Sequence, residues 1–158
     1  MDNARFSKLI SALHGTVYRV AYSYTRNHAD AEEITQDAFL KLYCSDKEFA
    51  SDSDVKAWLI RITINLSVSL LRSCWRKRRE ELPEIEIPAP EKESEDLREL
   101  INKLTPEQMT AVYLHYYEGY SIKETAKICG TTAASVTMRL ARARARLKTM
   151  LTEEDYHE

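Results

Sequence analysis

Glycine is scarce in this sequence: Gly15, Gly119 and Gly130 are the only three, and they stand far apart. A loop that wraps a phosphate needs several glycines within a few residues, so no nucleotide-binding motif of that type is present. The four histidines show no HExxH spacing, and no serine or cysteine lies in a nucleophile elbow. Because these common catalytic motifs are absent, we expect no enzymatic activity.

Cysteine is also rare. Cys44, Cys74 and Cys129 are odd in number, widely spaced and without a CxxC pair, and no histidine lies at a zinc-ligand spacing from any of them. We expect three reduced thiols on helices, with a redox-sensing role left open. No metal site and no cofactor are expected.

Long apolar runs are missing as well. No stretch approaches the roughly 18 residues that a membrane span needs. The first residues also lack the charged and apolar segments of a signal peptide. We therefore expect a cytoplasmic protein whose only contact with a membrane would be through a partner.

Charge is the first positive signal, because it is unevenly distributed. The formal net charge is only −2, yet segments 58–79 and 132–149 contain basic residues and no acidic residue. Acidic segments lie on both sides of 58–79 and directly after 132–149. Two such segments favour binding to a polyanion. The alternative is that these two segments form ordinary solvated helix faces without a polyanionic partner.

Apolar residues recur at helical spacing over 4–26, 29–44 and 54–79, which predicts three helices in the first half of the chain. The polar residues 45–53 are expected to form a loop. On the third helix, the predicted buried face comprises Val55, Trp58, Leu59, Ile62, Leu66 and Leu70.

A linker follows these helices. Residues 80–93 combine three prolines with six glutamates, which favours an extended segment. We assign residues 1–80 and 96–151 to two small helical domains and residues 81–95 to the acidic, proline-containing linker between them. With so few glycines and β-branched runs, the fold class is predicted to be all-α.

Capping residues mark the helix boundaries. In the second half, helices are predicted from Ser94, from Pro106 to near Gly119, from Ser121 to Gly130, and over 133–150. The predicted N-caps are Asn27 or Asp30 for the second helix of the chain, Thr105 and Ser121 with capping boxes, and Thr131 or Thr132 for the last helix.

Three positions between Lys123 and Leu140 match the requirements of a helix-turn-helix. Ala126 is small enough for two helices to cross closely. Gly130, four residues later, suits a turn that needs positive φ. Val136, six residues after that, supplies an apolar anchor on the second helix. An ordinary helical hairpin is the alternative to this C-terminal helix-turn-helix.

The last helix would then be the recognition helix, with Val136, Leu140, Ala143 and Leu147 facing inward. Its opposite face would contact base edges in a major groove, and its flanks and first backbone amides would contact phosphates. Because the side chains on the outward face are short, we expect modest sequence specificity from this helix alone. The candidate DNA-binding residues are Thr131, Thr132, Ala134, Ser135, Thr137, Met138, Arg139, Arg142 and Arg144.

The sequence resembles an extracytoplasmic-function sigma factor of the sigma-70 family over nearly its whole length. Residues 17–43 resemble the family's polymerase-binding region, residues 58–79 its −10 recognition region, and residues 104–147 its −35 recognition region. The resemblance implies that the chain binds core RNA polymerase and promoter DNA, and that the recognition helix contacts the −35 element.

The resemblance also implies roles for residues of the first unit. Loop residues 46–54 would capture a base flipped from the non-template strand. The −10 DNA would be contacted by Asn65, Arg72, Arg76 and Lys77. The coiled coil of the polymerase largest subunit would be contacted by Asp30, Glu33, Gln36, Asp37, Leu40 and Lys41.

Family members are usually held inactive by an anti-sigma factor, so such a partner is expected here too. Tyr113, Tyr116 and Tyr117 are candidates for its contact, with core packing as the alternative. The chain departs from the family pattern at Ser69, often Asp, and at Ala134-Ser135 and Thr137-Met138, which leaves the −35 sequence open. The competing interpretation is a stand-alone helix-turn-helix regulator that dimerises on a palindrome.

Overall fold

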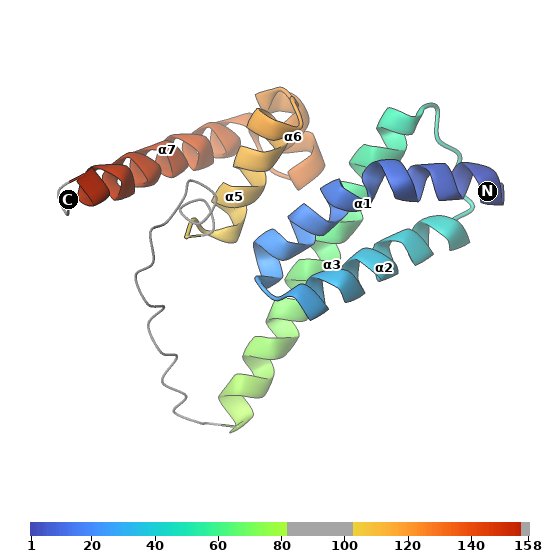
Figure 1. Cartoon of the computed structure of the whole chain (residues 1–158), viewed down its shortest axis with the longest axis horizontal. Helices are drawn as coiled ribbons and strands as arrows, with labels where there is room; N and C mark the ends of the chain where they lie inside the picture. Colours follow the sequence, from blue (N-terminus) through green and yellow to red (C-terminus); the bar gives the residue numbers. More distant parts are fainter. Residues whose placement is uncertain (82–102, 156–158) are drawn as a thin grey trace. The chain divides into compact units, whose positions relative to one another are not determined.

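The computed structural model describes residues 1–81 and 103–155 (Figure 1). Every regular element in these ranges is a helix, which confirms the all-α prediction. The chain divides into two compact units, Met1–Glu80 and Glu81–Glu158. Apart from Glu81, the predicted linker 81–95 lies outside the described residues, as does most of the helix expected from Ser94. No helix of the described ranges is long and apolar enough to cross a membrane.

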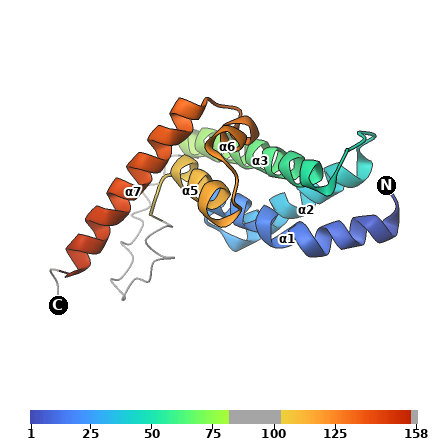
Figure 2. The same cartoon turned by 90° about the horizontal axis from the view of Figure 1, so that it is seen from above.

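The first unit consists of α1 (Asn3–Thr25), α2 (His28–Cys44) and α3 (Asp52–Glu81). Helices α1 and α2 lie side by side in both views, joined by a tight connection (Figures 1 and 2). Arg26 makes this connection possible by adopting a left-handed conformation with φ of 52° and donating its amide to the Tyr22 carbonyl. Of the two N-cap candidates for α2, Asn27 is the cap, because its Oδ1 accepts the Asp30 amide at 3.0 Å.

The core of the first unit lies between the three helices. The predicted inner face of α3 is confirmed in part: Val55 and Leu59 are fully buried, and the other predicted members pack against the core from partly buried positions. Ile60 and Ile64, which the prediction did not include, are buried as well. The buried side chains of the main cluster are Leu9, Leu13, Val17, Ala38, Phe39, Leu42, Val55 and Leu59. This packing determines which residues of α2 and α3 face the solvent.

Three hydroxyl side chains of the first unit are buried, although the sequence pattern does not assign them to the apolar face of a helix. Thr35, Thr63 and Ser67 are almost fully buried. Each hydroxyl donates to the carbonyl four residues earlier, at 2.6–2.7 Å. Because burying an unpaired hydroxyl is costly, these bonds make the burial tolerable. Tyr43 stands four residues after buried Phe39, and this spacing predicts that it also faces the core. It is instead 46% exposed and donates its hydroxyl proton to Asn3 Oδ1.

The second unit contains α5 (Pro106–Val112), a π-helical turn η1 (Tyr113–Tyr117), α6 (Ile122–Cys129) and α7 (Ala133–Asp155). Helix α7 packs against α5 and α6 near its start and extends beyond them (Figures 1 and 2). The buried core residues are Leu104, Met109, Ala111, Val112, Ala126, Val136, Leu140 and Ala143. The last helix continues five residues past the predicted end at 150.

The turn η1 was not predicted. The spacing indicates one ordinary helix from Pro106 to near Gly119, but after Val112 the backbone widens, and the Glu118 amide bonds to the Tyr113 carbonyl at 2.9 Å. Such an i→i+5 bond is the mark of a π turn, a feature often found at functional sites. Gly119, with φ of 79°, then ends the segment.

Both capping boxes of the second unit are present, at Thr105 with Gln108 and at Ser121 with Glu124. Ser121 Oγ accepts the Glu124 amide at 3.0 Å, and Glu124 Oε1 accepts the Ser121 amide at 3.1 Å. These bonds satisfy amides that a helix start otherwise leaves open. The beginning of α6 is therefore specified locally.

Replacing Ser121 with alanine is expected to lower the free energy of unfolding of the second unit by about 1 kcal/mol, because alanine cannot accept the Glu124 amide. Urea denaturation followed by circular dichroism measures the change. Ser121→Asp is the matched control, since aspartate is also a good N-cap. Equal losses for the two variants would contradict the capping explanation.

Candidate nucleic-acid interface

The turn between α6 and α7 has the geometry of a helix-turn-helix. Gly130 caps α6 in the left-handed conformation with φ of 68°, and the Thr131 amide reaches back to the Ala126 carbonyl at 2.9 Å. Ala126 and Val136 belong to the same core cluster and are 5% and 0% exposed. All three predicted roles are confirmed: the small residue at the crossing, the glycine in the turn, and the apolar anchor.

The start of α7 is capped by one of the two candidate threonines. Thr132 Oγ1 accepts the Ser135 amide at 3.1 Å, while Thr131 is half-buried in the turn. The Thr132 carbonyl also accepts the Val136 amide. The first turn of α7 is thus held at the point where the preceding helix ends, so the side chains that follow have a defined orientation.

The inward and outward faces of α7 agree with the predicted pattern. Val136, Leu140 and Ala143 are buried, and Leu147 packs against the same cluster. On the other side, the exposed predicted contacts are Thr132, Ala134, Thr137, Met138, Arg142 and Arg144, whereas Thr131, Ser135 and Arg139 are half-buried. Thr137 donates its hydroxyl proton to the Ala133 carbonyl at 2.9 Å, so the Thr137 hydroxyl oxygen can act only as an acceptor toward any other group.

The positive charge of α7 is uncompensated within the part of the chain that the structure describes. None of the five basic residues of this helix forms an ion pair with a described acidic side chain. Their positive potential therefore acts outward, as binding to a phosphate backbone requires. These residues are Arg139, Arg142, Arg144, Arg146 and Lys148.

A cysteine lies at the end of α6, directly before the turn. Burial raises the pKa of the Cys129 thiol, and the charge of Arg139 offsets this only in part. Cys129 therefore stays protonated at neutral pH. Cys44 and Cys74 are exposed, and all three are free thiols on helices, as expected.

The first unit carries its predicted DNA-contact residues on α3. Asn65 and Arg72 are exposed and stand seven residues apart, so they share one face of the helix. Arg76 and Lys77 continue this helix, but their side chains lie outside the described residues. Of the predicted contacts on α3, the described side chains are one amide and one guanidinium.

Helix α2 presents an acidic face with a leucine in it. Leu40 is 60% exposed, and Asp37 and Glu33 precede it by three and seven residues, which places all three on one side of the helix. Gln36 and Lys41 are exposed beside them, and Asp30 is half-buried. An exposed leucine among carboxylates suits a partner with a basic, partly apolar surface.

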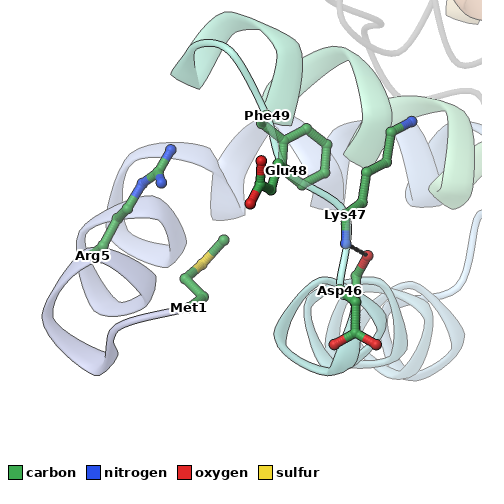
Figure 3. Close-up of a pocket in the computed structure, with 7 residues that line it drawn as sticks. Met1, Arg5, Asp46, Lys47, Glu48 and Phe49 are labelled. Atoms are coloured by element: carbon green, nitrogen blue, oxygen red, sulfur yellow. Dashed lines mark hydrogen bonds between the residues drawn. The ribbon is translucent and has the colours of Figure 1, made fainter.

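The loop between α2 and α3 borders a pocket of about 490 Å³ (Figure 3). Arg5 of α1 and Met1, which precedes this helix, line its other side, and the sequence pattern did not connect them with this loop. Phe49 packs edge-on against Trp58, with ring centroids 5.7 Å apart, and this contact anchors the loop. Trp58 thus packs with the core, as predicted, rather than projecting from it.

Comparisons with known proteins agree on both units. The Sigma-70 region 2 model matches residues 9–77, and the Sigma-70, region 4 model matches residues 94–147. The chain is similar to ECF RNA polymerase sigma factor SigE of Mycolicibacterium smegmatis, with 34% identity over 147 residues that cover 85% of this chain and 57% of SigE. It is also similar to ECF RNA polymerase sigma factor SigM of Mycobacterium tuberculosis, with 30% identity over 155 residues that cover 95% of this chain and 79% of SigM.

A solved structure has the same fold. It is the sigma factor RpoE from Bartonella quintana in complex with the anti-sigma factor NepR, with a TM-score of 0.75 and 27% identity, covering 94% of this chain and 97% of RpoE. The helix-turn-helix, the two family matches and the identity to SigM over most of both chains lead to one conclusion. The chain belongs to the extracytoplasmic-function group of the sigma-70 family of RNA polymerase sigma factors.

Proposed function

We propose that this sigma factor directs core RNA polymerase to promoters by holding the −10 and −35 elements with its two units, residues 1–80 and 96–151, joined by residues 81–95. The single observation that carries the proposal is the helix-turn-helix whose recognition helix has a basic surface without an ion pair to any described acidic side chain. The chain would act in the cytoplasm, where the polymerase transcribes, and without catalytic activity of its own.

The −35 element would be contacted by α7. Met138 and Arg142 stand on the exposed face, where base edges of a major groove would lie, and the Thr132-capped helix start offers amides to a phosphate. Few of these side chains can form a bidentate base contact, each of which is worth about 1–3 kcal/mol. Recognition by α7 alone would be weak, so a second DNA contact is needed.

The first unit would supply that second contact and the polymerase contact. Asn65 and Arg72 on α3 would bind −10 DNA together with Arg76 and Lys77. The acidic face of α2 around Leu40 would dock on the coiled coil of the polymerase largest subunit. The pocket beside Phe49 has room for an unstacked base, which supports base capture by this loop.

An anti-sigma factor is the expected inhibitor, because RpoE of Bartonella quintana was solved with one. Tyr116 and Tyr117, at 52% and 60% exposure, are available for such a partner, whereas Tyr113 packs against the core. Co-purification from the native cell would identify it, and a free monomer under all growth conditions would count against it.

Run-off transcription from genomic fragments tests the proposal. Core polymerase with this chain should initiate at specific sites that core polymerase alone ignores. Arg142→Ala and Arg72→Ala should each lower the yield about 5- to 100-fold, the equivalent of one lost strong DNA contact. Lys8→Ala, at an exposed position of α1, is the control and should leave the yield unchanged.

The alternative function, a stand-alone transcriptional regulator, predicts the opposite dependence on polymerase. It would bind a palindromic duplex as a dimer without polymerase, whereas the sigma factor should bind firmly only when the polymerase fixes both units and raises their effective concentration. Tight palindrome binding by the free chain, with no gain in initiation, would refute the proposal.

A further inference from the structure

Arg144 of α7 is held by a tyrosine from another element. Its Nη1 donates to the hydroxyl of Tyr116 at 2.6 Å, across a sequence separation of 28 residues. Both side chains are exposed. Arg144 is among the residues predicted to bind DNA, but the sequence predicted no DNA contact for Tyr116.

The π turn gives Tyr116 its place. Tyr116 lies within η1, and its ring meets His115 edge-on with centroids 5.0 Å apart. His115 is itself fixed, because Nδ1 donates to the Tyr120 carbonyl at 2.7 Å. The neighbouring Tyr117 packs instead on Tyr113, with centroids 5.3 Å apart. Two adjacent tyrosines therefore have different neighbours: Tyr116 bonds to Arg144, and Tyr117 packs on Tyr113.

The bond leaves donors free on both partners. A guanidinium has five N–H donors, and the bond to Tyr116 uses one of them. The phenol accepts that bond through its oxygen, so its own proton remains available to another acceptor. The pair can therefore present N–H and O–H donors to a single anionic oxygen. Because the bond to Tyr116 already restricts the Arg144 side chain, Arg144 loses less conformational entropy when it binds the anion.

The flank of a recognition helix is where DNA phosphates lie, and tyrosine and arginine are both common phosphate ligands. We propose that Tyr116 and Arg144 form one binding site for a backbone phosphate of the upstream promoter element, with Tyr116 as both ligand and positioning residue. This inference rests on the proposed function and deepens it. The site is built by η1 and α7 together, and neither element provides it alone.

The test uses the complex of core polymerase with the full chain and a promoter fragment identified by run-off transcription. Tyr116→Phe removes only the hydroxyl and should weaken binding about 3- to 10-fold, as expected for one hydrogen bond. Tyr117→Phe is the matched control and should have no effect. Arg144→Ala should weaken binding more, and Tyr116→Phe in that background should cost less than a further factor of about 1.5.

The outcomes separate the two proposals. Equal losses from Tyr116→Phe in the wild-type and Arg144→Ala backgrounds, equal losses for Tyr116→Phe and Tyr117→Phe, or no loss for Tyr116→Phe would each overturn the phosphate site. If Arg142→Ala and Arg144→Ala both left promoter binding unchanged, the proposed function of α7 itself would fail. Thermal unfolding of each variant shows whether a loss of binding reflects a loss of fold.

Discussion

Leu40→Asp is expected to lower the affinity of this sigma factor for core RNA polymerase about 10- to 100-fold, the effect of losing a strong interface contact. Leu40 is 60% exposed on α2 and contributes little to the core, so the fold should survive. Its place among carboxylates makes it the apolar centre of the proposed docking face. The added carboxylate would also have to be desolvated against the partner, which is costly without a matching cation.

Fluorescence anisotropy of the labelled chain against core polymerase measures this affinity. Leu151→Asp is the matched control, because Leu151 is 44% exposed on α7 and lies outside the docking face. Circular dichroism should show equal helix content for both variants. Wild-type affinity for Leu40→Asp would mean that the polymerase binds elsewhere on the chain.

Leu140→Ala is expected to destabilise the second unit by about 2–5 kcal/mol, because it leaves a cavity in a closely packed core. Leu140 is 2% exposed and packs in the cluster that also contains Ala126 and Val136. At about 0.05–0.15 kcal/mol per residue, the described part of this unit has a total stability of about 3–8 kcal/mol. The loss is a large share of that total, so transcription from promoters that need the −35 contact should fall with it.

The two units can be followed separately in one urea titration. Both tryptophans, Trp58 and Trp75, lie in the first unit, so their fluorescence reports its unfolding. Circular dichroism reports both units, and Leu140→Ala should add an earlier transition there while the fluorescence transition stays in place. Leu151→Ala, at an exposed position of the same helix, is the control. A variant with wild-type transitions would show that the core tolerates the cavity.

Local features of this protein were predictable because their causes are local. The boxes at Thr105 and Ser121 and the left-handed turn at Gly130 each depend on residues within about one helical turn. The buried face of α7 and part of that of α3 followed from spacing, since one apolar stripe has to face the core. The helix-turn-helix was predictable for the same reason, because Ala126, Gly130 and Val136 act over a short separation.

The errors of prediction have physical causes as well. Tyr43 fits the apolar stripe of α2, but it lies at the rim of the packed region, where its hydroxyl reaches Asn3 and its ring meets Phe6. Spacing gives the direction of a side chain and not the extent of the neighbouring helix that would cover it. Thr63 and Ser67 were missed for the converse reason, since their hydroxyls bond within their own helix and can then be buried.

Helix positions, caps, the recognition helix and its charged face were thus determined by residues close together along the chain, whose preferences need no distant partner. Three features were decided only by packing: the π turn at Tyr113–Tyr117, the bond from Arg144 to Tyr116, and the pocket shared by Arg5 and Phe49. Each joins elements far apart in sequence or changes the backbone after a helix has formed. Such contacts depend on where whole helices come to rest against one another, and no short stretch of residues encodes that.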